Sequence, residues 1–175
     1  FEGEFRDDHM HGTGLYQHAD GSRFEGDLRN DRMHGRGKYL YASGDVCEGD
    51  FVNDMSDGDG VFISADGTKY VGQFRADKRH GRGKLKAPSG ERYEGDFCNG
   101  FIQGSGVYRE FLAPQARKPG GEDGDTETGK VANAYSGQWE RGMMQGKGKF
   151  RFSNGNIYDG MIQHNACHGT GVLRL

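Results

Sequence analysis

The 175-residue chain has few cysteines, little hydrophobic content and no long apolar run. Its three cysteines are an odd number at unrelated positions, which argues against a disulfide framework and favours a reducing compartment. No apolar stretch approaches the ~20 residues that a membrane-spanning helix needs. Only 33% of the residues are hydrophobic, and the mean hydropathy is -0.90. These values favour a thin or extended structure over a globule with a thick core.

The chain also lacks an excess of positive charge. Its formal net charge is -3, whereas nucleic-acid-binding domains are usually strongly basic. We therefore expect no nucleic-acid partner. No signal-peptide pattern is present, and the chain opens within its repeating pattern at Phe1, so we expect it to be a fragment.

What the chain has in abundance is glycine, with 32 residues, most of them in a recurring motif. The motif reads aromatic-x-Gly-x-apolar, six residues, Gly-x-Gly-x-apolar, and then a turn with glycine. Its period is 23 residues, except where 19 further residues are inserted before the sixth copy. A fixed period predicts a repeat architecture and not a flexible linker. We expect one array over 1–175, with repeats starting at 1, 24, 47, 70, 93, 135 and 158.

Each repeat predicts one β-hairpin. In the fourth repeat, Tyr70–Phe74 and Gly81–Leu85 form two short strands that are joined by six residues. Tighter X-Gly turns, such as Asp66-Gly67, lead to the next hairpin. The sequence therefore predicts an all-β, open, solenoid-like meander of seven stacked hairpins. It has about 14 antiparallel strands and forms a twisted rod or groove.

The motif places its aromatic residues opposite glycines. Because Tyr70, Gly72 and Phe74 alternate along one strand, they share one face. A ring on that face can lie over a glycine of the neighbouring strand, which has no side chain to block it. We expect a ladder of rings and glycine gaps along this face. Cys47 takes a ring position in the third repeat, so we expect it to be a buried apolar filler.

The opposite face alternates in charge. First strands carry acids such as Glu25 and Asp27, and alternate second strands carry bases such as Arg36 and Lys38. Opposite charges on adjacent strands contribute roughly 0.2–1 kcal/mol each. The pattern allows two interpretations, a solvated face with acid–base ladders or a partner surface with a two-repeat rhythm.

Repeats such as Tyr93–Phe97 with Gly104–Tyr108 resemble MORN repeats, and the resemblance covers all seven units. It implies an elongated all-β rod. It also implies a scaffold in cilia, flagella or the cytoskeleton, a module at membrane contact sites, or an appendage of an enzyme. Phosphoinositide binding and dimerisation are further properties that the resemblance implies.

The insertion of residues 109–134 interrupts the array. It contains Pro114, Pro119, Gly120-Gly121 and the acidic run of residues 122–127. This composition is typical of an excursion from the turn side of the rod. It is either an inert loop or a docking element particular to this protein.

The sequence contains no recognisable active site, so we expect no enzyme activity and no cofactor. The position before the first glycine of each second strand accepts His80, Asp57 or Gln103, which predicts a turn-capping role and not a catalytic base. His164, Cys167 and His168 in the last hairpin tip are weak zinc candidates, since both residue types suit that ion.

We therefore expect a cytoplasmic scaffold of a cytoskeletal or ciliary assembly that binds a cytoskeletal or axonemal protein. A homodimer through the terminal edge strands is also expected. The partner-binding candidates lie along the ring groove or at hairpin tips: Phe74, Phe97, Phe101, Ile102, Trp139, Met143 and Met144. The alternatives are the non-catalytic arm of a larger enzyme and a module for phosphoinositide membranes. Candidate lipid-binding residues are Lys78, Arg79, Arg82, Lys84 and Lys86.

Overall fold

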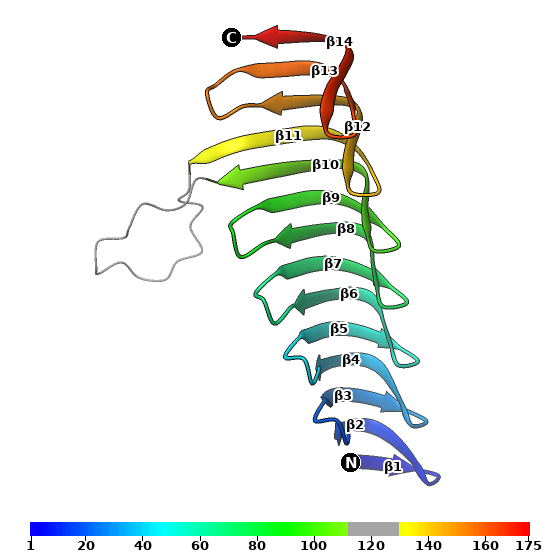
Figure 1. The fold of residues 1–175 in the computed structure, drawn as a ribbon. Coiled ribbons are helices and arrows are strands. Elements are labelled where there is room, and N and C mark those ends of the chain that lie inside the picture. The colour runs from blue at the N-terminus through cyan, green and yellow to red at the C-terminus, as the bar shows by residue number, and fades with distance from the viewer. Residues whose placement is uncertain (112–129) are drawn as a thin grey trace, which may run out of the picture.

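The computed structural model describes residues 1–111 and 130–175. These residues form one 14-stranded sheet, in which every strand pairs with its neighbours in sequence order from β1 to β14. All the pairs are antiparallel, and β1 and β14 are not joined to each other, so the sheet is open. Figure 1 shows the strands stacked as a gently curved ladder with the two termini at opposite ends. The all-β, open array that the sequence predicts is confirmed.

Seven hairpins make up the sheet. Their strands are β1 (Glu2–Arg6) and β2 (His9–Gln17), β3 (Arg23–Arg29) and β4 (Arg32–Leu40), β5 (Val46–Val52) and β6 (Met55–Ile63), β7 (Lys69–Arg75) and β8 (Lys78–Lys86), β9 (Arg92–Cys98) and β10 (Phe101–Phe111), β11 (Val131–Glu140) and β12 (Met143–Arg151), and β13 (Ile157–Gln163) and β14 (Ala166–Arg174).

The tip of each hairpin is a two-residue turn, which corrects the predicted six-residue connection. In the fourth hairpin Arg75 pairs with Lys78, so only Ala76 and Asp77 lie between the strands. These two residues have φ values of 46° and 62°, as the type I′ turns of hairpins require. The turns between hairpins are the longer ones, because residues 18–22 separate β2 from β3. Five of the seven tip turns contain no glycine, so the spacing of the glycines does not predict these turns.

The two glycines of each second strand have different roles. Gly81, the first of the pair in β8, has a φ of +60°, which a side chain disfavours. The register of β7 against β8 shifts beside it, between Gly72 and Gln73. Such bulges bend a strand, and Figure 1 shows the hairpins bending before their tips. Gly83, the second glycine, lies under a ring.

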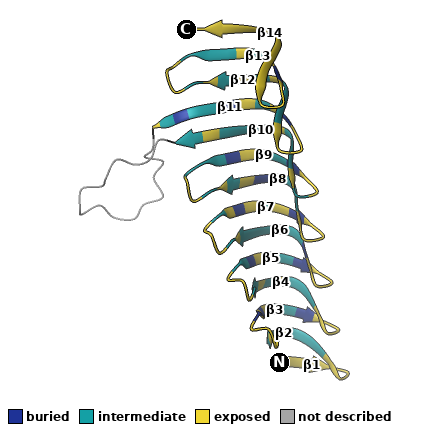
Figure 2. Cartoon of the chain, viewed as in Figure 1, coloured by how far each residue is buried: buried dark blue, intermediate teal, exposed yellow. Residues whose placement is uncertain are grey.

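Rings lie over glycines as predicted. A Cβ atom on Gly83 would come within 2.5 Å of the Tyr70 ring atom Cε2. Tyr70 also meets Phe74 of its own repeat and Phe97 of the next repeat edge to face, with both pairs of ring centroids 5.1 Å apart. Each such pair contributes about 0.5–1.5 kcal/mol beyond area burial. The rings therefore connect consecutive repeats into one core, and Figure 2 shows the buried residues recurring along the stack.

The third repeat interrupts this core. Cys47 replaces the ring there and is 2% exposed, which confirms its burial, and its Sγ atom lies 3.3 Å from the hydroxyl of Ser56. The core divides at this point into one cluster around Phe24 and Phe51 and a second that starts at Tyr70. Phe62 packs against both clusters.

The predicted insertion begins and ends within strands. Residues 109–111 of β10 pair with residues 131–134 of β11. The rest of the insertion, residues 112–129 with the acidic run, lies outside the described residues.

Candidate interaction surfaces

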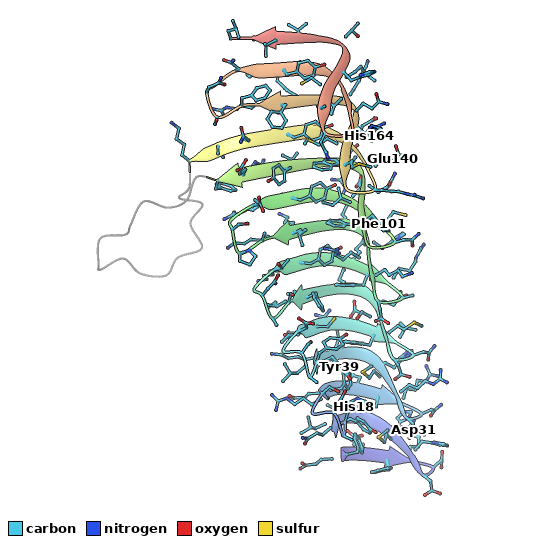
Figure 3. All side chains as sticks on the ribbon, viewed as in Figure 1. His18, Asp31, Tyr39, Phe101, Glu140 and His164 are labelled. Atoms are coloured by element: carbon cyan, nitrogen blue, oxygen red, sulfur yellow. The ribbon has the colours of Figure 1, made fainter. Side chains whose placement is uncertain are left out.

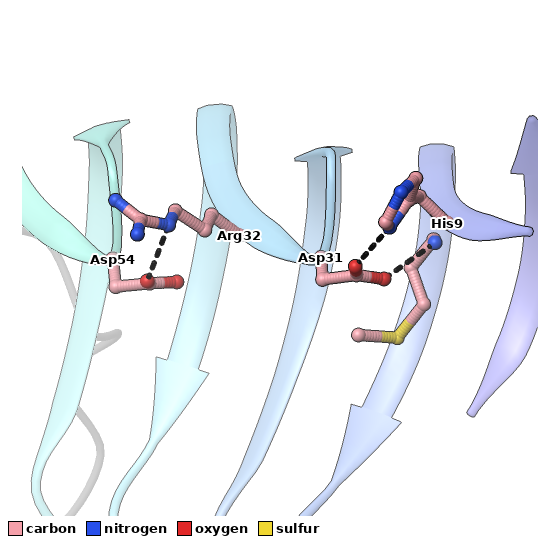
Figure 4. Close-up of polar contacts among 5 residues, drawn as sticks. His9, Asp31, Arg32 and Asp54 are labelled. Atoms are coloured by element: carbon pink, nitrogen blue, oxygen red, sulfur yellow. Dashed lines mark hydrogen bonds and ion pairs between the residues drawn. The ribbon is translucent and has the colours of Figure 1, made fainter. Parts of the chain in front are cut away.

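Stacked tips are joined by a reciprocal pair of hydrogen bonds. The backbone N–H of Asp54 donates to the carbonyl oxygen of Met33, and the Met33 N–H donates to Asp54 Oδ1 at 2.9 Å. Asp31 makes the same pair of bonds with Met10, as Figure 4 shows in part. Asp77 and Asn165 repeat the arrangement. This role is not predicted from the sequence above, although Asp31, Asp54 and Asp77 recur 23 residues apart.

The first of these tip contacts also joins two titratable groups. His9 Nδ1 lies 2.5 Å from Asp31 Oδ2. This hydrogen bond, with the attraction between the charges, raises the pKa of His9 and lowers the pKa of Asp31. Arg32 takes the place of His9 one repeat later, 4.0 Å from Asp54. Both pairs are exposed, so their contribution to stability is small.

The polar residue that precedes the first glycine of each second strand can accept a hydrogen bond from the next tip. Asp57 Oδ2 accepts a hydrogen bond from the N–H of Ala76, and Gln103 Oε1 accepts one from Arg141. The predicted turn-capping role is confirmed at these positions. Where histidine takes this position, the buried Nδ1 atoms of His11 and His80 have no hydrogen-bond partner within residues 1–111 and 130–175.

The fifth and sixth tips differ from the others, because glycine replaces the aspartate or asparagine that the other tips carry. Gly100 and Gly142 still donate their N–H groups to the previous tip, to the carbonyl oxygens of Arg79 and Ile102. They have no carboxylate to offer in return. Beside them lie Phe101, which is 57% exposed, and Met143, which is 37% exposed. The Gly142–Ile102 bond places these tips side by side, and we call Phe101 and Met143 the tip pair.

Not all of the predicted binding residues are accessible. Phe74, Phe97 and Trp139 are 8%, 3% and 7% exposed. They lie within the core because the bent hairpins enclose the ring face. Ile102 and Met144 are half-buried and pack against the same core. Among the predicted binding residues, only the tip pair is exposed, and Figure 3 shows Phe101 on the tip edge of the sheet.

The tyrosine hydroxyls of the core have structural partners. Tyr70 donates its O–H to the carbonyl oxygen of Gln73 at 2.8 Å, and Tyr93 donates to that of Asp96 at 3.1 Å. Burial raises the pKa of both tyrosines to about 12. These groups therefore stay protonated at neutral pH and serve packing.

The outer face, opposite the rings, carries acid–base ladders. Arg82 pairs with Asp96 at 2.9 Å, and Lys84 pairs with Glu94 at 3.2 Å. Arg36 and Lys38 pair in the same way with the third repeat. Bases of one repeat thus meet acids of the next repeat, and ladders are confirmed. Asp96 has a second role, because its Oδ2 accepts the N–H of Ser105.

The five basic candidates for lipid binding do not form one patch. Lys78 and Arg79 belong to the fourth tip, where the Arg79 guanidinium donates to the carbonyl oxygen of Gly100 and lies 5.6 Å from the Phe97 ring centroid. Arg82, Lys84 and Lys86 lie on the outer face, and the first two are in ion pairs. Lipid binding by this set stays a prediction.

The zinc candidates do not converge. Cys167 and His168 are consecutive in β14, so their side chains point to opposite faces. His164 lies in the tip turn, and its N–H donates to Gln145 Oε1. No group of three or more His, Cys, Asp and Glu side chains suited to a metal ion occurs among the described residues.

The terminal strands are exposed along one edge each. Every residue of β1 and β14 is exposed, whereas the inner strands are partly buried. Pairing of these edges in a homodimer stays a prediction. In the described part of the chain, no helix qualifies as a membrane span.

Comparison with known families identifies the repeat. The family model for the MORN repeat matches residues 1–23, 24–46, 47–69, 70–92, 93–109, 135–157 and 158–175. Among curated proteins, Alsin from Rattus norvegicus, Mus musculus and Homo sapiens is 40% identical to the chain over 40 residues. This match covers 23% of the chain and only 2% of Alsin.

Proposed function

The chain belongs to the MORN-repeat family, and from this premise we propose that it is a non-catalytic scaffold that binds a protein partner at its hairpin tips. The family is a family of binding repeats. The single observation that carries the proposal is the tip pair, an exposed phenylalanine and methionine on adjacent tips.

The tip pair suits an apolar anchor of a partner. Phe101 is rigid and presents a ring, while methionine adapts to different partner shapes. The half-buried Ile102 and Met144 lie beside them and connect the pair to the core. A helix or loop of the partner that inserts an apolar side chain between Phe101 and Met143 would remove both from water.

Glycine at these two tips supports the same proposal. At the third tip, Met55 is 41% exposed, but Asp54 beside it presents a carboxylate. Gly100 and Gly142 present none. The turn residues at the tip pair therefore offer no carboxylate for a partner to desolvate, although Glu140 is paired with Met143 across the hairpin. Burying an unpaired charge would be costly.

The test compares three baits in a quantitative affinity purification from cells. We expect Phe101→Ser with Met143→Ser to lose a defined set of bound proteins, while Met55→Ser retains it. Interface anchors contribute about 2 kcal/mol or more, so the loss should be roughly 30-fold or greater. Circular dichroism melting of all three baits controls for folding. Equal recovery with every bait would contradict binding at the tips.

The family resemblance supplies the proposed setting, which is a cytoplasmic cytoskeletal or ciliary assembly. Imaging of the tagged protein beside a marker of the axoneme tests it. A diffuse distribution that is unchanged in the Phe101→Ser, Met143→Ser variant would contradict this setting.

A further inference from the structure

A row of basic side chains crosses four adjacent strands on the outer face. Lys69 of β7 is paired with Lys86 of β8, Lys86 is paired with Arg92 of β9, and Arg92 is paired with Arg109 of β10. The row is local, since Ile63 precedes it on β6 and Ala134 follows it on β11. We call these four residues the basic row.

The basic row departs from the acid–base ladders of the same face. In those ladders bases face acids, as Lys84 faces Glu94, and the other like-charged partners, Arg29 with Arg32 and Arg75 with Lys78, flank hairpin tips. In the basic row like charges lie directly opposite each other on strands about 4.8 Å apart, an arrangement that destabilises a sheet. Within residues 1–111 and 130–175, no ion pair involves Lys69, Lys86 or Arg109. A costly arrangement of this kind is expected where the charges serve binding and not the fold.

The surface beside the row is a shallow hollow with an apolar part. Val71, which is 41% exposed, lies beside the row on β7, where it is paired with Lys84 of the neighbouring ladder. The same hollow is lined by Lys69, Lys86 and Arg109, and by Lys84 and Glu94 of that ladder. The Arg92 guanidinium lies 4.9 Å from the centroid of the Phe111 ring. This stacking orients one base of the row, and Val71 offers contact to an aliphatic stem.

We propose that the basic row binds an acidic peptide segment of a partner protein, which lies across strands β7 to β10. The row is one residue wide and crosses four strands, so it matches a linear ligand with several carboxylates. Its neighbours on the same face include Glu94 and Asp96. A flat anionic bilayer or a nucleic acid would bring its own charge against these acids, whereas a single peptide strand need not.

The probe is a fluorescein-labelled peptide of ten glutamates, and the readout is fluorescence anisotropy at low and at physiological salt. We expect Lys69→Gln with Lys86→Gln to weaken binding at least tenfold. The control variant, Lys147→Gln with Lys149→Gln, removes the same charge from β12 on the same face and should bind as the wild type does. The melting temperature of the Lys69, Lys86 variant should not fall, because neutralisation removes repulsion.

Several results would overturn the proposal. Equal affinity of the wild type and the Lys69, Lys86 variant would do so, as would equal loss in the control variant. Row-dependent binding to phosphatidylserine vesicles without peptide binding would assign the row to membranes. A several-fold gain in affinity when the four acids of residues 122–127 become amides would assign it to the chain's own segment. The Phe101→Ser, Met143→Ser variant should bind the peptide normally, so this test is independent of the tip proposal.

Discussion

Replacing Gly83 with alanine tests the contact between a ring and a glycine directly. The new Cβ would lie 2.5 Å from Tyr70 Cε2 and 2.5 Å from the Tyr70 hydroxyl oxygen. The backbone of Gly83 does not have a left-handed φ, so alanine brings no backbone strain. Tyr70 is 1% exposed and cannot move without displacing Phe74 and Phe97. The ring and the new methyl group therefore compete for one space.

The expected cost follows from three contributions. Overpacking of a core costs about 1–3 kcal/mol. Displacement of Tyr70 also breaks its 2.8 Å hydrogen bond to the Gln73 carbonyl oxygen, and the loss of this bond costs about 0.5–1.5 kcal/mol of stability. Replacing glycine by alanine offsets about 0.4–1 kcal/mol of this loss, because alanine restricts the unfolded chain. We expect a net loss of about 2 kcal/mol, or roughly 4–8 °C in Tm.

The third repeat supplies the matched control. Gly60 occupies the same repeat position as Gly83, but Cys47 stands where the ring would be. The nearest atom to a Cβ on Gly60 is the Glu48 carbonyl oxygen at 3.1 Å, followed by a Phe74 ring atom at 3.2 Å. We expect Gly60→Ala to stay within about 1 kcal/mol of the wild type.

Urea unfolding followed by circular dichroism and by the fluorescence of Trp139, the single tryptophan, measures both variants. Tyr70→Cys copies the third repeat, and in that background Gly83→Ala should cost no more than Gly60→Ala does. Equal destabilisation by Gly83→Ala and Gly60→Ala in the wild-type background would refute the contribution of ring–glycine packing.

Two further predictions concern titratable groups. The pKa of His9, followed by NMR, should lie above its ordinary value of about 6.5 and return toward it in Asp31→Asn; an unchanged titration would contradict the tip contact. Its stabilising contribution should be complete below the ordinary pKa and be lost as pH rises through the raised one, while that of Asp31 should be lost as pH falls through its lowered pKa. Under native conditions a thiol reagent should modify the exposed Cys98 and Cys167 quickly and Cys47 slowly, because burial both shields Cys47 and raises its pKa. Equal rates at all three thiols would contradict the packing of the third repeat.

The sequence predicts the repeat, the strands and the ring–glycine contacts because each follows from a residue type at a fixed interval. Tyr70 over Gly83 is one example, since only glycine leaves room for the ring. The burial of Cys47 follows from its place in the same pattern. The acid–base ladders follow from the alternation of side chains along strands.

The sequence does not predict the bend of the hairpins. Gly81 and Gly83 read alike in the motif, although one adopts a positive φ at the bend and the other lies under a ring. Without the bend, Phe74 and Trp139 are predicted to line a groove, whereas in the bent hairpins both are buried. The basic row was missed for a related reason, because Lys69 and Arg109 are distant in sequence and only the strand register aligns them.

Small-angle X-ray scattering tests the central claim, that the chain is an open, extended array with edges and faces for binding. Fourteen strands at about 4.8 Å spacing span about 65 Å, so we predict a radius of gyration above about 19 Å from length alone. A compact domain of this size would have a radius of gyration of about 16 Å, and that value would contradict the account.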